Sequence, residues 1–556
     1  MMVPTRLARL LVAVLVVAGT AWPALVRAAQ MYNEAEQIPA GLSGDRERLS
    51  LYHRGHAALL QWDVREAATN VLPAALKQAD EDPEAAYFLA HYYFMVSQYE
   101  KARNFLDMAN GRDQRVNARF EPYLAAALRH TATYQEEQRE HFVYRFAPGI
   151  DDILVDYADR ALSAAWEALG TDLGHRPSEK IVVEFVTSAT ALGELTGLPE
   201  EAIHTTGTIA IAKFNRLIIT TPRVTTMGYR WLDTAVHEYA HLVVCQVSRN
   251  RIPIWLHEGL AQLEEKRHRQ PPKGEDDPRA QSLLARALRT GRFITLEQMH
   301  PSMALLPSKE DGALAYAEVL SMARFLYKLH GGYANISKLL REMRLQDDLD
   351  AAFRSVYGFD IATLERRWKQ YLRSQNLRET DNRPGLDIGF RKQKSTPLRT
   401  EEEDDPADED IFLGKSPGAR YFRIGKLLKD RGRLKAAIAE FEKAVPALGP
   451  YNPLLQNAIA STWLNLENPA KAAASLEPLL TRYDGPALTY FNLGQAYLAM
   501  GQDFKAIEHL LIVVDINPFD PRCHLLLSDL YRKTGDSDSA DREAQVFKRL
   551  SAYLQR

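Results

Sequence analysis

The sequence has few cysteines, no excess of positive charge and no long hydrophobic run beyond its N-terminus. Its 556 residues include two cysteines, Cys245 and Cys523, so a disulfide framework is not expected. Lys and Arg number 69 against 72 Asp and Glu, and this balance gives no indication of nucleic-acid binding. Because 556 residues are too many for one compact domain, we expect several domains.

The N-terminus has the pattern of a secretory signal peptide. Two arginines precede an apolar run and then small residues in "MMVPTRLARLLVAVLVVAGTAWPALVRAAQ". We assign residues 1–29 to this signal, with cleavage after Ala28 or Ala29. An uncleaved anchor is the alternative, but Pro23 interrupts the apolar run and favours cleavage. The mature chain is therefore expected outside the cytoplasm, in a bacterial periplasm, with no transmembrane segment.

Small residues recur in the C-terminal part of the chain at a spacing of 34 or 35 residues. One column is Gly425, Ala460, Gly494 and Ser528, and a second is Ala437, Ala472, Ala506 and Ala540. A similar pair of columns near the N-terminus is Gly55 with Ala90 and Ala67 with Ala102. The pattern resembles tetratricopeptide (TPR) repeats, in which paired helices pack closely at small residues. The resemblance implies two to three TPR-like repeats at 45–135, about four at 418–556, and binding of protein partners.

The stretch "DTAVHEYAHLVV", residues 233–244, places three ionisable side chains in an apolar run. On a helix, His237 and His241 share one face, and both imidazoles can reach one metal ion. Glu238 can then reach a water molecule and act as a base. The alternative is a pair of buried histidines that bond to neighbouring carbonyl groups.

A second motif follows in "IPIWLHEGLAQLEE", residues 252–265, which predicts a helix starting at Pro253. HExxH followed by W-L-x-E-G-L-A resembles the gluzincin metallopeptidases, especially the peptidase MA-like group related to the M1 aminopeptidases. This resemblance implies that Glu258 is the third ligand of a Zn²⁺ ion, beside the two histidines. It also implies that Glu238 is the general base and that the substrate is a polypeptide.

Several positions depart from the family pattern. No GxMEN-like motif precedes HExxH, so exopeptidase activity is not supported and an endopeptidase is expected. Gln262 stands where thermolysin-like relatives have an aspartate that supports a ligand histidine. Asp233 is one replacement, but the helix N-cap is the preferred interpretation of this residue. Glu264 and Glu265 are interpreted as a solvated helix end, and His257 as structural.

The flanking segments predict a small sheet before the metal motif. Residues 180–186 read as one strand, and residues 207–220 as two short strands around Asn215–Arg216 or one bent strand. In the resembling fold, the edge strand of this sheet pairs with extended peptide, which reads the backbone and tolerates many sequences.

The segments after the motif predict helices. Residues 312–332 have helical apolar spacing, with Gly331 as the stop. Relatives carry a tyrosine here that donates to the oxyanion, and Tyr316 is the candidate. Residues 351–372 resemble the terminal helices of such a domain, with Trp368 in the core.

We therefore expect a mostly α fold with a small α+β part. A zincin-like metallopeptidase domain at 140–375 lies between two α-solenoid segments, and a polar acidic linker at 376–417 precedes the second. The expected function is zinc-dependent hydrolysis of peptide bonds in cell-envelope proteins. Two alternatives stay open: a non-catalytic TPR scaffold whose domain binds peptide, and a zinc hydrolase acting on a cell-wall amide.

Overall fold

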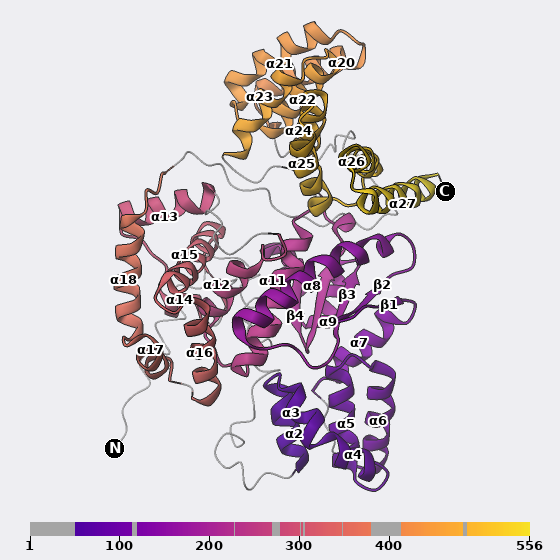
Figure 1. Cartoon of the computed structure of the whole chain (residues 1–556), viewed down its shortest axis with the longest axis vertical. Helices are drawn as coiled ribbons and strands as arrows, with labels where there is room; N and C mark the ends of the chain where they lie inside the picture. Colours follow the sequence, from indigo (N-terminus) through magenta and orange to yellow (C-terminus); the bar gives the residue numbers. More distant parts are fainter. Residues whose placement is uncertain are drawn as a thin grey trace.

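A computed structural model describes most of the chain outside its N-terminus and the predicted linker. The described residues are 51–113, 119–226, 228–269, 278–300, 302–303, 306–346, 348–379, 413–481 and 486–555. The predicted signal peptide and most of the predicted linker lie outside them. Figure 1 shows N-terminal helices, a central domain with a sheet, and a C-terminal array of paired helices.

A mixed five-stranded sheet lies at the centre of the domain. In the order β1-β2-β3-β5-β4, its strands are β1 (Gln135–Gln138), β2 (Phe142–Phe146), β3 (Ile181–Val186), β5 (Arg216–Thr220) and β4 (Ala210–Lys213). The inner pairs are parallel and the two outer pairs antiparallel. The predicted strands at 180–186 and 207–220 are thus present, and the second is a hairpin. Its turn residues Phe214 and Asn215 have φ of 53° and 57°, as a two-residue hairpin turn with the favoured twist requires.

Both faces of the sheet are covered, which explains why every residue of β3 is buried. Ile181, Val183 and Phe185 pack on one face against α8 (Leu154–Leu173) and α11 (Trp231–Ser248). The opposite face packs against helices N-terminal to it in the chain (Figure 1). These are chiefly α5 (Pro83–Met95), α6 (Tyr99–Arg112) and α7 (Glu121–Thr131), together with α9 (Ala189–Thr196) of the domain itself.

A buried ion network joins the second face of the sheet to the N-terminal helices. Glu184 of β3 is fully buried and lies 3.3 Å from both Arg145 and Arg216. Tyr99 of α6 donates to Glu184 and accepts a hydrogen bond of 2.6 Å from Arg216. Because buried charges need partners, this network fixes how the N-terminal helices sit on the sheet.

The N-terminal helices begin with α2 (Leu51–Leu60), α3 (Val64–Asn70) and α4 (Leu72–Gln78). Gly55 of α2 faces the ring of Phe88 so closely that a Cβ there would overlap it. The predicted small-residue positions therefore do lie at helix contacts. Assignment of this segment to the TPR class stays a prediction.

The rest of the central domain is helical. Its helices after α11 are α12 (Ile254–Glu264), α13 (Pro278–Thr290), α14 (Leu296–Met299), α15 (Lys309–Lys328), α16 (Gly332–Leu345), α17 (Leu349–Tyr357) and α18 (Ile361–Ser374). The helices predicted at 312–332 and 351–372 are present, and Trp368 is 2% exposed. Gly331 was expected to stop the first of these. It instead precedes α16 as its N-cap, because α15 already ends three residues earlier.

The C-terminal array consists of four helix pairs, as the spacing of small residues predicts. The pairs are α20 (Gly418–Asp430) with α21 (Leu434–Leu448), α22 (Pro453–Asn465) with α23 (Pro469–Leu480), α24 (Ala487–Ala499) with α25 (Asp503–Ile516), and α26 (Pro521–Thr534) with α27 (Ser537–Leu554). A Cβ on Gly425 would lie 2.5 Å from the ring of Phe441. The small residues therefore allow the two helices of a pair to touch.

Candidate metal centre

Helix α11 presents both histidines of the HExxH motif on one face. The ring centroids of His237 and His241 are 4.6 Å apart, with their planes nearly perpendicular. Their side chains are 17% and 12% exposed, so the two imidazoles lie at a partly open position. This geometry is what a four-residue spacing on a helix produces.

Helix α12 brings a carboxylate to the same point. Glu258 Oε2 lies 3.6 Å from His237 Nε2 and 3.6 Å from His241 Nε2. The three donor atoms lie within 4.8 Å of one another. Donors about 2.0–2.2 Å from a tetrahedral zinc ion are about 3.3–3.6 Å apart. Two imidazoles and one carboxylate at these separations therefore fit zinc, and their role as ligands stays a prediction.

The glycine after Glu258 allows α12 to approach α15. A Cβ at Gly259 would lie 2.5 Å from the carbonyl oxygen of Val319. Any larger side chain would push α12 away from α15 and move the Glu258 carboxylate with it. The E-G pair in the second motif thus has a packing reason as well as a chemical one.

The three donor residues have strongly coupled charges. Burial opposes the charged form of His237, but the carboxylates of Glu258 and Glu265 outweigh it and raise the pKa of His237 to about 10. Burial likewise opposes ionisation of Glu258, yet His241 and His237 hold the pKa of Glu258 well below its usual range. A metal ion needs the neutral imidazole, so binding at this site would release a proton.

The predicted base, Glu238, points to the edge of the sheet. Its Oε2 accepts a hydrogen bond of 2.6 Å from the backbone N–H of Ala212 on β4. The side chain is buried, with the residue 8% exposed. The edge strand therefore holds the Glu238 carboxylate next to the candidate ligand His237 in the chain.

Tyr316 lies on α15, close enough to the centre to respond to its charges. The Glu258 carboxylate, with partial burial and the Glu238 carboxylate, raises the pKa of the Tyr316 phenol. The residue is 42% exposed. Tyr316 therefore lies within electrostatic range of Glu258 and Glu238, and its oxyanion role stays a prediction.

The supporting side chains differ from those expected. Asp233 is not the N-cap of α11, because the helix begins two residues earlier and Arg230 is the N-cap. Its carboxylate accepts a 2.5 Å hydrogen bond from Arg269. Glu264 is not part of a solvated helix end, because it is 3% exposed and accepts from Tyr333. Glu265 Oε2 lies 3.7 Å from His237 Nδ1, which puts a carboxylate beside the second nitrogen of the ring.

His257 has the structural position expected of it. It stacks on His241 with ring centroids 4.4 Å apart, and its Nε2 lies 3.2 Å from the Cys245 sulfur. Burial first, and the neighbouring His241, lower the pKa of His257 to about 3. A neutral ring thus packs behind His241, and the Cys245 thiol is buried and bonds to Asn250 at 3.4 Å.

Two contacts of the centre are invisible in the motifs. The Ala212 N–H comes from a strand 26 residues before Glu238. Glu265 sits one turn beyond Gln262, the position that the family pattern indicates. The only sequence signal for either was general: a strand before HExxH, and an acidic pair ending the second motif.

Comparisons with known proteins agree with this architecture. The sequence model of the Peptidase MA superfamily matches residues 163–374, and a tetratricopeptide repeat model matches 419–445 and 487–520. The whole chain has no match among curated proteins. The first family match contains α11, α12 and α15, and begins after the strands β1 and β2.

Solved structures match the chain at low identity and low TM-score. MamA residues 41 to the end from Desulfovibrio magneticus RS-1 is 20% identical over 27% of this chain and 89% of that one, with a TM-score of 0.24. The APC/C hetero-tetramer Cut9-Hcn1 is 14% identical over 91% and 80%, also with a TM-score of 0.24. These scores carry no argument about the overall fold. The family matches do, and the chain carries a Peptidase MA superfamily domain followed by tetratricopeptide repeats.

Proposed function

We propose that the protein is a zinc-dependent endopeptidase that hydrolyses peptide bonds of cell-envelope proteins. The observation that carries this proposal is the convergence of His237, His241 and Glu258 on one point, with Glu238 beside them. A complete set of two imidazoles, a ligand carboxylate and a further carboxylate is what metal-assisted amide hydrolysis requires.

The chemistry that zinc supplies at such a donor set is Lewis acidity, which polarises a carbonyl and lowers the pKa of a water molecule. Glu238 would take the proton of the attacking water on Oε1, because Oε2 already accepts from Ala212. It would then deliver that proton to the leaving nitrogen as the C–N bond breaks. Tyr316 would donate to the oxyanion.

The edge strand supports a polypeptide substrate. β4 pairs with β5 on one side, and the amide of Ala212 points away from that pair toward Glu238. An extended peptide would align along the outer edge of β4 through backbone hydrogen bonds and would then pass beside the metal ligands. Recognition of this kind selects extended conformation rather than sequence.

The repeats support recruitment of a protein. Two of the four helix pairs match the tetratricopeptide model, and arrays of such pairs present extended surfaces to partners. Among the helices of the described ranges, none has both the length and the hydropathy to cross a bilayer. Location in the periplasm is part of the proposal and rests on the N-terminal signal pattern.

Metal content is the first test. We expect about one zinc ion per chain in the wild-type protein and a large loss in Glu258→Ala, measured by elemental analysis of tag-free protein. Glu297→Gln, which changes an exposed carboxylate on α14, is the matched control and should retain the metal. A wild-type protein that takes up no zinc, even when zinc is supplied, would overturn the proposal.

Turnover is the second test. Glu238→Gln keeps an oxygen for the Ala212 N–H, so it should keep zinc and lose turnover of denatured protein by about 10²- to 10⁴-fold. Full activity in this variant would exclude Glu238 as the base. Parallel incubation with cell wall separates the alternatives: cleavage of cell wall alone indicates a cell-wall amidase, and cleavage of neither by zinc-loaded protein indicates a scaffold.

A further inference from the structure

The helix that carries the metal ligands has no N-terminal cap of its own. The side chain of its N-cap residue, Arg230, caps none of the first backbone N–H groups, and these groups need acceptors. The acceptor instead comes from the C-terminal repeats. Asp515 Oδ1, on α25, accepts a 3.1 Å hydrogen bond from the N–H of Leu232.

The end of α25 also contacts the start of α11 directly. Val514 O accepts from the Trp231 indole at 3.1 Å, and Ile516 O accepts from the Tyr229 N–H at 3.2 Å. Carbonyl groups at the end of α25 lack partners within their own helix. Donors at and just before the start of α11 supply such partners, with the negative end of one dipole against the positive end of the next.

Charge pairs surround this junction. Asp515 Oδ2 lies 3.2 Å from Arg230 and 3.0 Å from Arg269, and the residue is 3% exposed. Arg269 also bonds to Asp233 in the first turn of α11. Burial, and then the nearby Asp515, raise the pKa of Asp233 to about 8. Asp515 is thus a buried acceptor that bonds to the start of the metal helix through Leu232 and Arg230, and also to Arg269.

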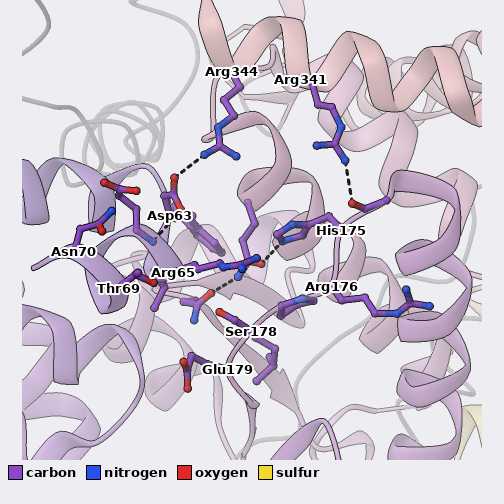
Figure 2. A pocket seen from close by; sticks show the side chains of 18 residues that line it. Asp63, Arg65, Thr69, Asn70, His175, Arg176, Ser178, Glu179, Arg341 and Arg344 are labelled. Carbon is purple, nitrogen blue, oxygen red and sulfur yellow. Dashed lines mark hydrogen bonds and ion pairs between the residues drawn. The ribbon is translucent and has the colours of Figure 1, made fainter. Parts of the chain in front are cut away.

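The other end of α11 is held by an aspartate from the N-terminal helices. Asp63 accepts from Arg249, the C-cap of α11, at 2.8 Å and 3.1 Å, and from Arg344 of α16 at 2.9 Å. This carboxylate lines a cavity of about 420 Å³ between α3, α16 and the start of β3 (Figure 2). Arg341 there bonds to backbone carbonyls at 2.9 Å and 3.1 Å. The guanidinium groups of Arg341 and Arg344 already have acceptors in the chain, and these contacts join α16 to Asp63 and to the end of α8.

We propose that Asp515 is a positioning residue for the metal centre. It lies on the third repeat and orients the helix that carries both histidines. This inference rests on the proposed zinc function. Leu232 lies five residues before His237, so opening the first turn of α11 leaves the ligand helix anchored from one side only. Ligand atoms must stay within about 0.2 Å of their bonding distances, and a frayed helix start loosens that geometry.

The variants distinguish loss of the hydrogen bond to Leu232 from loss of the Asp515 charge and from weaker docking of the repeats. Asp515→Ala removes the acceptor, and Asp515→Asn keeps an oxygen for the Leu232 N–H. Glu543→Gln is the matched control, because Glu543 accepts from Tyr157 of α8 at 2.8 Å and holds the fourth repeat without contacting α11. Asp515→Ser, whose hydroxyl is too short to reach Leu232, provides a milder change if the alanine variant does not fold.

Zinc affinity is the first readout, measured by competition with a chelator. We expect Asp515→Ala and Asp515→Ser to weaken it about tenfold, within the range for residues that orient ligands, and Asp515→Asn to restore most of the loss. Glu543→Gln should lower the melting temperature and leave zinc affinity unchanged. If the Asp515 variants lower zinc affinity no more than Glu543→Gln does, Asp515 only contributes to docking of the repeats and the inference is overturned.

Amide exchange in the metal-free protein is the second readout and does not depend on the zinc function. The Leu232 N–H should exchange about tenfold faster in Asp515→Ala than in the wild type, because a cap of typical strength is lost. Unchanged exchange would overturn the inference. A wild-type protein that binds no zinc would overturn the proposed function, while the exchange result would still decide whether Asp515 holds α11.

Discussion

The N-terminal helices and the C-terminal repeats are built from similar helix pairs, yet they join the central domain in different ways. The N-terminal helices share a hydrophobic core with the second face of the sheet. The C-terminal array does so only in part. Its first pair and the start of its second form a separate cluster, and α22–α27 continue into the core of the domain.

The charged groups at the two joints also differ in their exposure to solvent. The N-terminal joint contains a fully buried carboxylate, Glu184, between two arginines. The C-terminal joint uses the edge of the domain: a buried cap at Asp515, and an ion pair between Arg549 and Asp152 that is half exposed. The first region therefore forms a layer on the sheet of the central domain. The second is a docked arm whose far end, α20–α23, projects away from the domain in Figure 1.

The largest effect should come from the buried network. Glu184→Gln leaves Arg216 buried without a charged partner, so the free energy of unfolding should fall by about 3–5 kcal/mol in urea titrations. The matched control is Glu136→Gln, because Glu136 pairs with Arg145 of the same network but is 41% exposed. This control should cost under about 1 kcal/mol. Similar small losses in both variants would mean that the N-terminal helices are docked no more firmly than the repeats.

A glycine at the C-terminal joint should give the next largest effect. Gly228 has φ +70° and faces the carbonyl of Ile516 at the end of α25, so a Cβ there would overlap it. Gly501 has φ +71° with nothing near its Cβ position. Both alanine variants pay the same backbone strain, about 1 kcal/mol. Gly228→Ala should cost about 1–3 kcal/mol more in thermal or urea unfolding, and equal losses would show that the joint yields to the added methyl group.

Local patterns predicted much of this architecture. The 34-residue spacing of small residues identified the C-terminal helix pairs, because a close contact between helices admits only small side chains. The four-residue spacing of His237 and His241 put both on one face of a helix. The apolar residues around Glu184 at 180–186 indicated the strand that became β3, but not that both of its faces are buried.

Other features depend on contacts that no local pattern contains. Strand β1 reads "QEEQ" and has no apolar alternation, so nothing distinguishes it from a loop. Asp233 was interpreted as an N-cap because the residue that holds this position, Arg230, is not a typical capping residue. The missing acceptor, Asp515, is 283 residues away from the N–H that it binds, and only the folded chain brings the two together.

Acid should loosen the N-terminal layer before the repeats. His56 Nδ1 and His91 Nδ1 lie 2.9 Å apart between α2 and α5. Burial lowers the pKa of His91 to about 4, and burial with His91 lowers the pKa of His56. Below pH 6.5 the unfolded chain therefore binds protons that these two histidines do not bind in the folded chain. The free energy of unfolding is unaffected by them above pH 6.5 and falls as the pH drops toward 4.

The expected loss from His91 alone is about 1.4 kcal/mol at pH 5.5, with a further loss from His56, measured as the urea midpoint of the N-terminal helices by amide exchange. His91→Gln should reduce the pH dependence, whereas His300→Gln, at an exposed position, should keep it. An unchanged dependence in His91→Gln would assign the acid sensitivity to other groups and remove this difference between the two regions.

The smallest effect should come from the exposed end of the C-terminal joint. Arg549 on α27 lies 3.0 Å from Asp152 and bonds to the Gly149 carbonyl, but its side chain is 49% exposed. Solvent screens such a pair, so Arg549→Ala should lower the free energy of unfolding by less than about 1 kcal/mol, and less still in high salt. Glu543→Gln changes the buried part of the same repeat and should cost more, because Glu543 is 1% exposed and accepts from both Tyr157 and His524. If Arg549→Ala proves the costlier of the two in urea unfolding, the last repeat is held chiefly by its exposed ion pair and not by its buried contact with α8.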